Sequence, residues 1–542
     1  MVRNASASCW KKVFAGLLIL SALILLFWRL DDAVLERDEA DTAVVASDMV
    51  TRASWVPRYL DGPQLLAPGA DGHDFNRQFL PSMQSWLEYY VDAVAFRLFG
   101  VSTEVARFPF ALLGIVSLIA LYRTGRALFG AGWRSWLPMI LALFSIYSLT
   151  VFREARYYSL VYLLSSLIIL DLCGYIRFPE RARSPWLYVR LGLYGLFLYY
   201  SNYLSFAGMW FSLAVFAILS RDRMFQRRLA VVTAALAIPL AIDFGIVHSA
   251  FLQSAMNEHA HPLWWIFKTE IKYTVWTVWC TIPLLLVIPL GIYVFRRGTN
   301  PPATLARAAL LSVCVVCCSI VFETLLAREH AESRYYLQIL PAMVVLQSIL
   351  IVRLSHLSRP AVAACGLLVV LIWPNLSFYT YWDDEVVERQ LLALHSMNEP
   401  LLNFLREHAR PNETYEIYPD GKAQIVDFYL PGLKWVGALD SSDPRVQRYR
   451  GVLPASAFDD YNKVDWIIVW YSPWDTTGRG PRMLTPEYIP VWEGRFRHPQ
   501  SFWDLTFPRF RNLPRVGEEY RVYHKGPATS ISSPPALRKW RG

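Results

Sequence analysis

VFAGLLILSALILLFW at residues 13–28 is an uncharged apolar segment, and the acidic stretch RDEADTA follows it at residues 37–43. Lys11 and Lys12 precede the apolar segment, and no small-residue cleavage site comes after it. The segment is therefore predicted to be a retained membrane anchor and not a signal peptide. The carboxylates of the acidic stretch then begin the first loop on the far side of the membrane, a placement that points to chemistry at a membrane face.

The composition agrees with a membrane enzyme. Of 542 residues, 54% are hydrophobic and only 18% are charged, which is too apolar for a soluble multidomain protein. The net charge of +9 does not indicate nucleic-acid binding, because the arginines form short clusters between apolar segments, as cytoplasmic loops that meet anionic lipid do. The seven cysteines lie in or beside apolar segments, so neither a disulfide framework nor a zinc knuckle is predicted.

The apolar segments predict a polytopic α-helical membrane protein of about eleven spans. The spans are expected near 13–30, 109–123, 136–152, 158–176, 187–203, 205–220, 229–248, 276–295, 308–326, 336–352 and 360–379. Arginine clusters such as those at 123–134, 177–190 and 221–228 fall in alternate loops, which are therefore expected on the cytoplasmic side of an inner membrane. The odd number of spans then places the carboxyl-terminal segment outside, together with the acidic loop.

The first outer loop, 31–108, is counted with a transmembrane domain of residues 1–379. Its sequence predicts a helix over Asp38–Arg52 and an amphipathic, aromatic-rich helix over Trp86–Leu98 that would lie along the membrane interface. A turn between two spans is expected at Ser201-Asn202.

The carboxyl-terminal segment is predicted to form an extracytoplasmic α/β domain over residues 380–527. A periodic pattern around 386–408 predicts a helix, and β-rich runs at Tyr415–Tyr418 and Trp466–Trp470 predict strands. The Ser/Pro-rich end, 528–542, is predicted to be disordered.

Several segments resemble the GT-C superfamily of membrane lipid-linked sugar transferases, in the branch of aminoarabinose transferase, protein mannosyltransferase-like and RgtA/B/C/D-like proteins. The segments are RDEADTAVVASDMV (37–50), FRLFGVSTEVARFPFALLG (96–114), LYRTGRALFG (121–130), REARYYSL (153–160) and SRYYLQILPAM (333–343). The resemblance implies a GT-C-like fold and an inverting glycosyltransferase, hexosyl or pentosyl, of cell-envelope glycan biosynthesis. It would use a polyprenyl-phosphate sugar donor and a lipid, glycan or protein acceptor.

Such a transfer needs a base for the acceptor hydroxyl, and Asp38 is the candidate. A carboxylate at the membrane edge beside a second acid is suited to accept a proton, and the resemblance implies the same role. On a helix, Glu39 points about 100° away from Asp38, so it is expected to orient Asp38 or a metal ion. The alternative is that both acids merely favour a helix amino terminus.

The transfer also needs cations for the leaving phosphate. Arg153 and Arg156 lie in a short outer loop, where a forked guanidinium suits phosphate oxygens, although long side chains also reach headgroups from such places. The resemblance favours Arg334 and Tyr335 as phosphate-facing residues of a second cluster, and the same alternative holds there.

The loop 249–275 carries further candidates. His259 and His261 have a spacing that suits a metal chelate, so a divalent ion is possible, although no cofactor is required by the proposed reaction. Lys268 and Lys272 are alternative contacts for the donor phosphate. Asp171, Asp243 and Glu323 lie inside apolar segments and are expected to pack against arginines, although Asp243 and Glu323 could instead line the site.

Two other classes of function remain open. A transporter or flippase of lipid-linked glycans would place its charges near mid-membrane in paired halves, whereas the charged clusters here gather at one face and no second half repeats the first. An inactive assembly subunit would leave the acidic loop without a use. A glycosyltransferase accounts both for the acidic loop and for the charged clusters at one face.

The arginine asymmetry generates a test of the topology. Reporter fusions after Arg228 and after Thr380 are expected to report opposite sides of the membrane, the first inside and the second outside. A cytoplasmic signal from the fusion after Thr380 would contradict the number of spans and would separate the carboxyl-terminal domain from the acidic loop.

Overall fold

A computed structural model describes residues 2–31, 33–57, 81, 85–247, 302–326, 337–357, 398–418, 423–435, 464–471, 486–495 and 519–526. The chain divides into two compact units by its internal contacts. The helical unit comprises Met1–Leu30, Gln84–Val91 and Glu104–Leu392, and the α/β unit comprises Asp31–Met83, Asp92–Thr103 and Ala393–Gly542. Helix α3 (Leu87–Phe99) runs from the first unit into the second.

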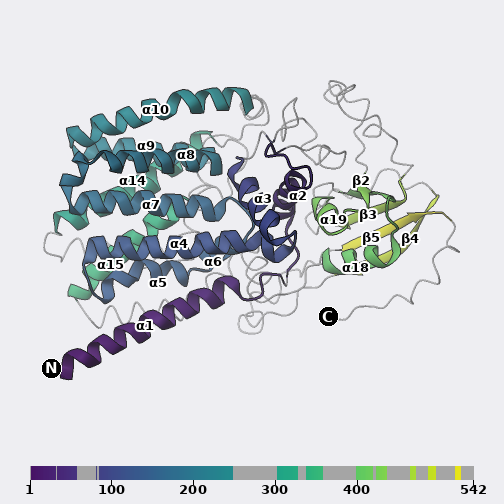
Figure 1. Cartoon of the computed structure of the whole chain (residues 1–542), viewed down its shortest axis with the longest axis horizontal. Helices are drawn as coiled ribbons and strands as arrows, with labels where there is room; N and C mark the ends of the chain where they lie inside the picture. Colours follow the sequence, from purple (N-terminus) through teal and green to yellow (C-terminus); the bar gives the residue numbers. More distant parts are fainter. Residues whose placement is uncertain are drawn as a thin grey trace, which may run out of the picture. The chain divides into compact units, whose positions relative to one another are not determined.

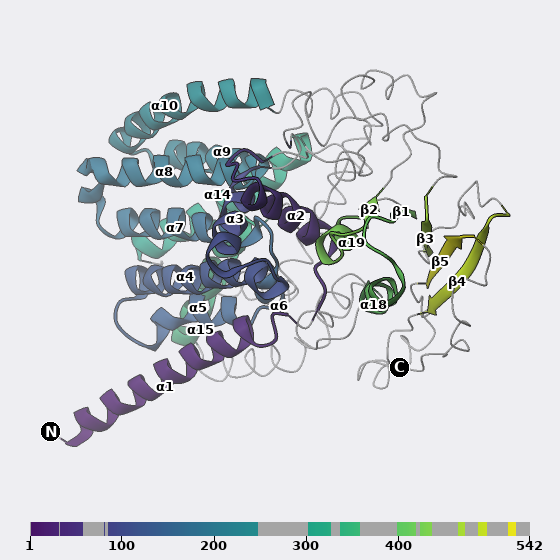
Figure 2. The same cartoon turned by 45° about the vertical axis from the view of Figure 1, so that its right-hand side comes forward.

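The helical unit is a bundle of apolar helices that lie side by side (Figures 1 and 2). Its helices are α1 (Val2–Phe27), α4 (Thr103–Phe129), α5 (Leu137–Leu143), α6 (Ile146–Arg153), α7 (Tyr158–Arg177), α8 (Pro185–Ser201), α9 (Tyr203–Ser220), α10 (Arg223–Val247), α14 (Ala303–Leu326) and α15 (Ile339–Leu357). In the described part of the chain, α4, α7, α9, α10 and α14 are long and apolar enough to cross a membrane. This is a multi-pass membrane protein, as the sequence predicted.

Burial separates the inside of the bundle from its lipid-facing side. Helix α7 contacts α8, α14 and α15 and is buried along most of its length, with Val161, Tyr162 and Leu172 inaccessible. Helix α10 instead exposes large apolar side chains, and Val231 and Ile238 are each 69% exposed. Such an apolar surface is stable against lipid tails and costly against water.

The third expected span, 136–152, is not one helix, which corrects the sequence interpretation. Helix α5 ends at Leu143, and α6 begins only after Ser145, whose backbone is extended. The Ser145 hydroxyl accepts the Ser148 N–H at 3.3 Å, so it caps a new helix and replaces a hydrogen bond that a continuous helix would have. The expected spans 276–295 and 360–379 lie outside the described residues.

The expected turn between α8 and α9 is confirmed. Asn202 is extended, and its side-chain oxygen accepts the Ser205 N–H at 2.8 Å, which starts α9 directly after α8.

Polar side chains within the bundle are paired across helices. Arg190 of α8 holds Asp171 of α7 in a two-bond fork at 2.7 and 2.9 Å, which confirms the expected arginine partner for this acid. Asp243 of α10 instead accepts a hydrogen bond from the Tyr199 hydroxyl of α8 at 3.0 Å. Both contacts satisfy polar groups that would be costly beside lipid.

The α/β unit contains a mixed sheet of strand order β2-β1-β3-β5-β4. Its strands are β1 (Thr414–Tyr418), β2 (Lys434–Trp435), β3 (Trp466–Tyr471), β4 (Tyr488–Arg495) and β5 (Glu519–Lys525). Strand β1 pairs in parallel with β2 and β3, whereas β5 pairs antiparallel with β3 and β4. Strand β3, rich in β-branched and aromatic residues, lies at the centre, and the proline of β4 lies at an edge where a missing N–H is tolerated.

The predicted strands at 415–418 and 466–470 are confirmed, with β1 and β3 one residue longer. Of the helix expected around 386–408, the structure describes the part that forms α18 (Asn398–His408). A second helix of this segment, α19 (Ala423–Tyr429), was not expected.

Helix α2 (Arg37–Thr51), the predicted acidic helix, packs on α19 and belongs to the α/β unit. The expected division of the chain counted residues 31–108 with the transmembrane domain. By contacts, the described part of residues 31–57 and the segment 92–103 group with the carboxyl-terminal segment instead. The expected tail, 528–542, lies outside the described residues.

Candidate active site

The acidic motif forms the first turn of α2. Glu36 precedes the helix in an extended conformation, and its N–H donates to the Glu39 carboxylate at 3.0 Å. This is one half of a capping box, in which a side chain one turn into the helix satisfies a donor at the helix start. Only 1% of Glu39 is exposed. The carboxylate of Glu39 therefore stabilises the start of the helix.

Asp38 is the more accessible of the two adjacent acids, being half-buried. Thr42, one turn later, is buried and donates from its hydroxyl to the backbone carbonyl of Asp38 at 3.2 Å. Two carboxylates in the first turn also interact favourably with the positive end of the helix dipole. The structure thus gives Glu39 a capping role and leaves Asp38 as the acid that solvent or a ligand reaches more easily.

Arg153, at the end of α6, is buried against the end of α1. Its guanidinium donates to the carbonyls of Leu25 and Trp28 at 2.9 Å each and to that of Arg29 at 3.3 Å. The last carbonyls of a helix lack partners within the helix, and a cation is favourable there. Arg153 thus acts as a cap for α1.

Arg156 contacts a carboxylate that the sequence interpretation missed. Its Nη1 lies 3.5 Å from Oε1 of Glu88, and both side chains are almost inaccessible. The other oxygen of Glu88 accepts the Tyr157 N–H at 2.6 Å. The guanidinium also lies over the rings of Tyr157 and Tyr158, 5.3 and 5.9 Å from their centroids. Glu88 sits in the predicted amphipathic helix, but no local pattern signals a partner so distant in the sequence.

Several predicted site residues lie outside the described residues. These are Arg334 and Tyr335, Lys268 and Lys272, and the pair His259 and His261. Within the described ranges, no three His, Cys, Asp or Glu side chains gather as metal ligands would. The histidine pair therefore stays a prediction.

A second carboxylate with an unusual environment lies on α19. The Tyr415 hydroxyl donates to Asp427 at 2.8 Å, and the other oxygen of Asp427 is shielded from solvent. Burial, and to a smaller degree the nearby carboxylate of Asp48 on α2, raises the pKa of Asp427 to about 7 against the opposing effect of the Tyr415 hydrogen bond. The contact between α2 and α19 therefore contains a carboxyl group that is largely protonated below neutral pH.

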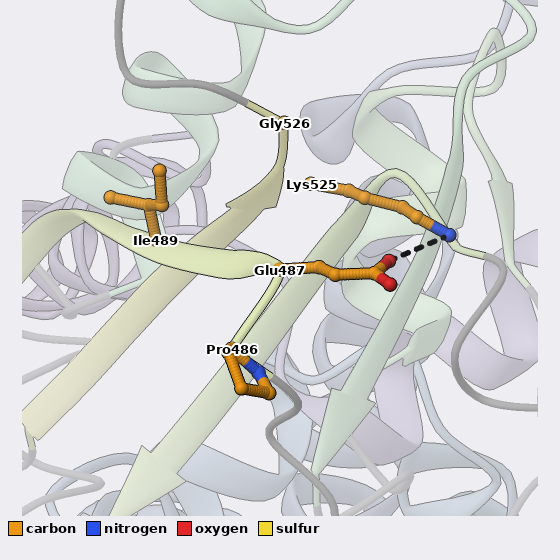
Figure 3. A pocket seen from close by; sticks show the side chains of 5 residues that line it. All are labelled: Pro486, Glu487, Ile489, Lys525 and Gly526. Atoms are coloured by element: carbon orange, nitrogen blue, oxygen red, sulfur yellow. Dashed lines mark ion pairs between the residues drawn. The ribbon is translucent and has the colours of Figure 1, made fainter.

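A shallow hollow lies beside β4 and β5, lined by Pro486, Glu487, Ile489, Lys525 and Gly526 (Figure 3). Glu487 and Lys525 form an ion pair at 3.6 Å across it, and the Glu487 side chain is 64% exposed. An exposed pair of this kind contributes little stability. The hollow contains none of the predicted site residues.

Known proteins resemble this chain in sequence over one segment and in structure over nearly all of it. The model of the dolichyl-phosphate-mannose-protein mannosyltransferase family matches residues 84–245, which hold Glu88, Arg153 and Arg156. No curated protein matches the chain in sequence.

Two matching crystal structures are of ArnT from Cupriavidus metallidurans. The structure bound to undecaprenyl phosphate matches at a TM-score of 0.55 and 15% identity, over 94% of this chain and 98% of that one. The apo structure matches at 0.56 and 15% identity, over 95% and 98%. The chain has the GT-C fold. The matches confirm the resemblance to GT-C lipid-linked sugar transferases that the sequence motifs indicated, and with it the predicted fold class.

The ion pair of Arg156 and Glu88 generates a stability test. Replacing Glu88 by Gln keeps an acceptor for the Tyr157 N–H but removes the charge beside a buried guanidinium, so the free energy of unfolding should fall by about 3 kcal/mol. Unfolding in detergent would measure it. Glu180→Gln, at an exposed glutamate of the same unit, is the control and should change stability by less than about 0.5 kcal/mol. Equal effects of both variants would mean that the pair is not stabilising.

The raised pKa of Asp427 generates a pH dependence. A carboxyl group whose pKa is higher folded than unfolded contributes stability that is fully present below the ordinary carboxyl range and is lost as the pH rises through about 7. The thermal midpoint of the protein should therefore fall between pH 5 and pH 8 more steeply than that of Asp427→Asn. Parallel pH profiles for the two proteins would contradict the assignment.

Proposed function

We propose that this protein is an inverting glycosyltransferase that moves a sugar from a polyprenyl-phosphate donor to a lipid, glycan or protein acceptor on the outer face of the cytoplasmic membrane. The observation that carries the proposal is the match of residues 84–245 to a mannosyltransferase family whose name specifies a polyprenyl-type phosphate donor. The GT-C fold of the whole chain supports it, as does the undecaprenyl phosphate bound in one of the matched ArnT structures.

In the proposed reaction, the acceptor oxygen forms a bond to the anomeric carbon of the sugar. The bond from that carbon to the phosphate oxygen breaks, and the polyprenyl phosphate leaves with the bonding electron pair. The acceptor proton passes to Asp38, which is the more accessible acid of the motif. Glu39 serves this step by holding the first turn of α2 through its bond to the Glu36 N–H.

Among the described cations, Arg156 is the candidate for the donor phosphate. Arg153 already donates to three carbonyls at the end of α1, whereas the guanidinium of Arg156 is fixed by Glu88 and two tyrosine rings. A fixed, poorly hydrated guanidinium suits phosphate oxygens. Arg334, Tyr335, Lys268 and Lys272 remain further candidates from the sequence. The reaction requires no cofactor, and a divalent ion at His259 and His261 stays a separate hypothesis.

The proposal is tested by donor turnover. Purified full-length protein would be incubated with radiolabelled polyprenyl-phosphate sugars, both hexoses and pentoses, and an acceptor mixture from cell envelopes. We expect one donor to be consumed and Asp38→Asn to lower its turnover at least about a hundredfold, the effect of removing a positioned base, while donor binding is retained.

Asp31→Asn is the matched control, because Asp31 is an exposed aspartate just before the same helix. It should turn over the donor at the normal rate. If no donor is consumed, the transferase proposal fails. If a donor is consumed equally by the Asp38→Asn protein, the reaction stands but Asp38 is not its base.

A further inference from the structure

Helix α19 of the carboxyl-terminal segment packs on the acidic helix α2. The two helices bury apolar side chains, among them Val45 and Met49 of α2 and Ile425 and Val426 of α19. The ring of Phe428 also lies against that of Phe96, with centroids 6.3 Å apart. Apolar packing of this kind holds helices together but tolerates small shifts along their axes.

One polar contact of α19 fixes the place where α2 begins. The hydroxyl of Tyr429 accepts the N–H of Leu35 at 3.0 Å and forms a second hydrogen bond, at 2.6 Å, with the hydroxyl of Thr103. A hydroxyl has one proton and two acceptor positions, so it can serve both partners at once. Leu35, Thr103 and Tyr429 all belong to the α/β unit, and they come from three separate segments of the chain.

The next residues after Leu35 continue this chain of contacts into the acidic motif. Glu36, the following residue, donates its N–H to the Glu39 carboxylate. Two hydrogen bonds thus hold the backbone that leads into the first turn: Tyr429 accepts the Leu35 N–H, and Glu39 accepts the Glu36 N–H. Asp38 follows closely after Leu35 and Glu36, in the first turn of α2. Leu35 and Glu39 are both almost inaccessible, which keeps water from replacing either bond.

We infer that Tyr429 is a positioning residue for Asp38, so that the carboxyl-terminal domain sets the geometry of the catalytic acid. The role of Asp38 in this inference rests on the proposed function, whereas the hydrogen bond by which Tyr429 holds the start of α2 does not. A general base must stay within a fraction of an ångström of its productive position, and small displacements lower the rate of the chemical step. The hydroxyl of Tyr429 supplies that constraint at the start of α2.

The test uses full-length protein with Tyr429→Phe, which keeps the ring and removes the hydroxyl. Hydrogen exchange of a peptide that covers residues 33–40 should become about fivefold faster, as expected from the loss of one hydrogen bond. The kcat for the donor identified above should fall about tenfold, while binding of undecaprenyl phosphate stays unchanged. Thr103→Val removes the other hydroxyl of the pair and is expected to lower kcat in the same direction.

Tyr520→Phe is the matched control. Tyr520 is a buried tyrosine of the same unit whose hydroxyl bonds Asn398 at 2.7 Å, so its loss tests the general cost of removing a tyrosine hydroxyl from this domain. It should leave exchange at residues 33–40 and kcat unchanged. Equal effects of Tyr429→Phe and Tyr520→Phe would overturn the inference, as would unchanged exchange and kcat in Tyr429→Phe. If the unmodified protein consumes no donor, the proposed function fails, and the exchange comparison alone still decides whether Tyr429 holds the start of α2.

Discussion

Charged groups that leave water need a partner, and this constraint decides where Arg153 and Arg156, two buried arginines of the described residues, lie. Arg153 is buried because three carbonyls at the end of α1 accept its hydrogen bonds, and Arg156 is buried because Glu88 lies beside it. Each contact joins segments that are far apart in the sequence. The same requirement explains the fork between Arg190 and Asp171. A bundle surrounded by lipid can hold such charges only where its helices meet, so these pairs also fix which helices are neighbours.

The α/β unit solves a different problem, which is how to hold the short helix α2. Helix α2 is amphipathic and too short to be stable alone, so it depends on packing. The carboxyl-terminal segment supplies this support through α19. The contact combines apolar packing, the hydroxyl of Tyr429 at the helix start and the buried carboxyl group of Asp427. The carboxyl-terminal segment therefore contributes directly to the structure that holds the acidic motif.

The sequence predicted the features that depend on local pattern. Apolar segments predicted helices of the bundle, the acidic and amphipathic stretches predicted α2 and α3, and β-rich runs predicted β1 and β3. It missed the break at Ser145, because one serine in an apolar run does not reveal that its side chain caps a new helix. It named Arg153 as a candidate for phosphate or headgroups but did not reveal its carbonyl partners, and it overlooked Glu88 and Tyr429. Those three roles depend on pairings over long separations, which neither periodicity nor motif spacing encodes.

The central proposal is that this protein binds a polyprenyl phosphate and that a buried guanidinium holds the phosphate. The most direct measurement is a cryo-electron microscopy structure of the full-length protein with undecaprenyl phosphate. The account predicts phosphate density in hydrogen-bond contact with the guanidinium of Arg156, with the prenyl chain running along the helical unit. Lipid density confined to the exposed apolar side of α10, with none at Arg156, would contradict it.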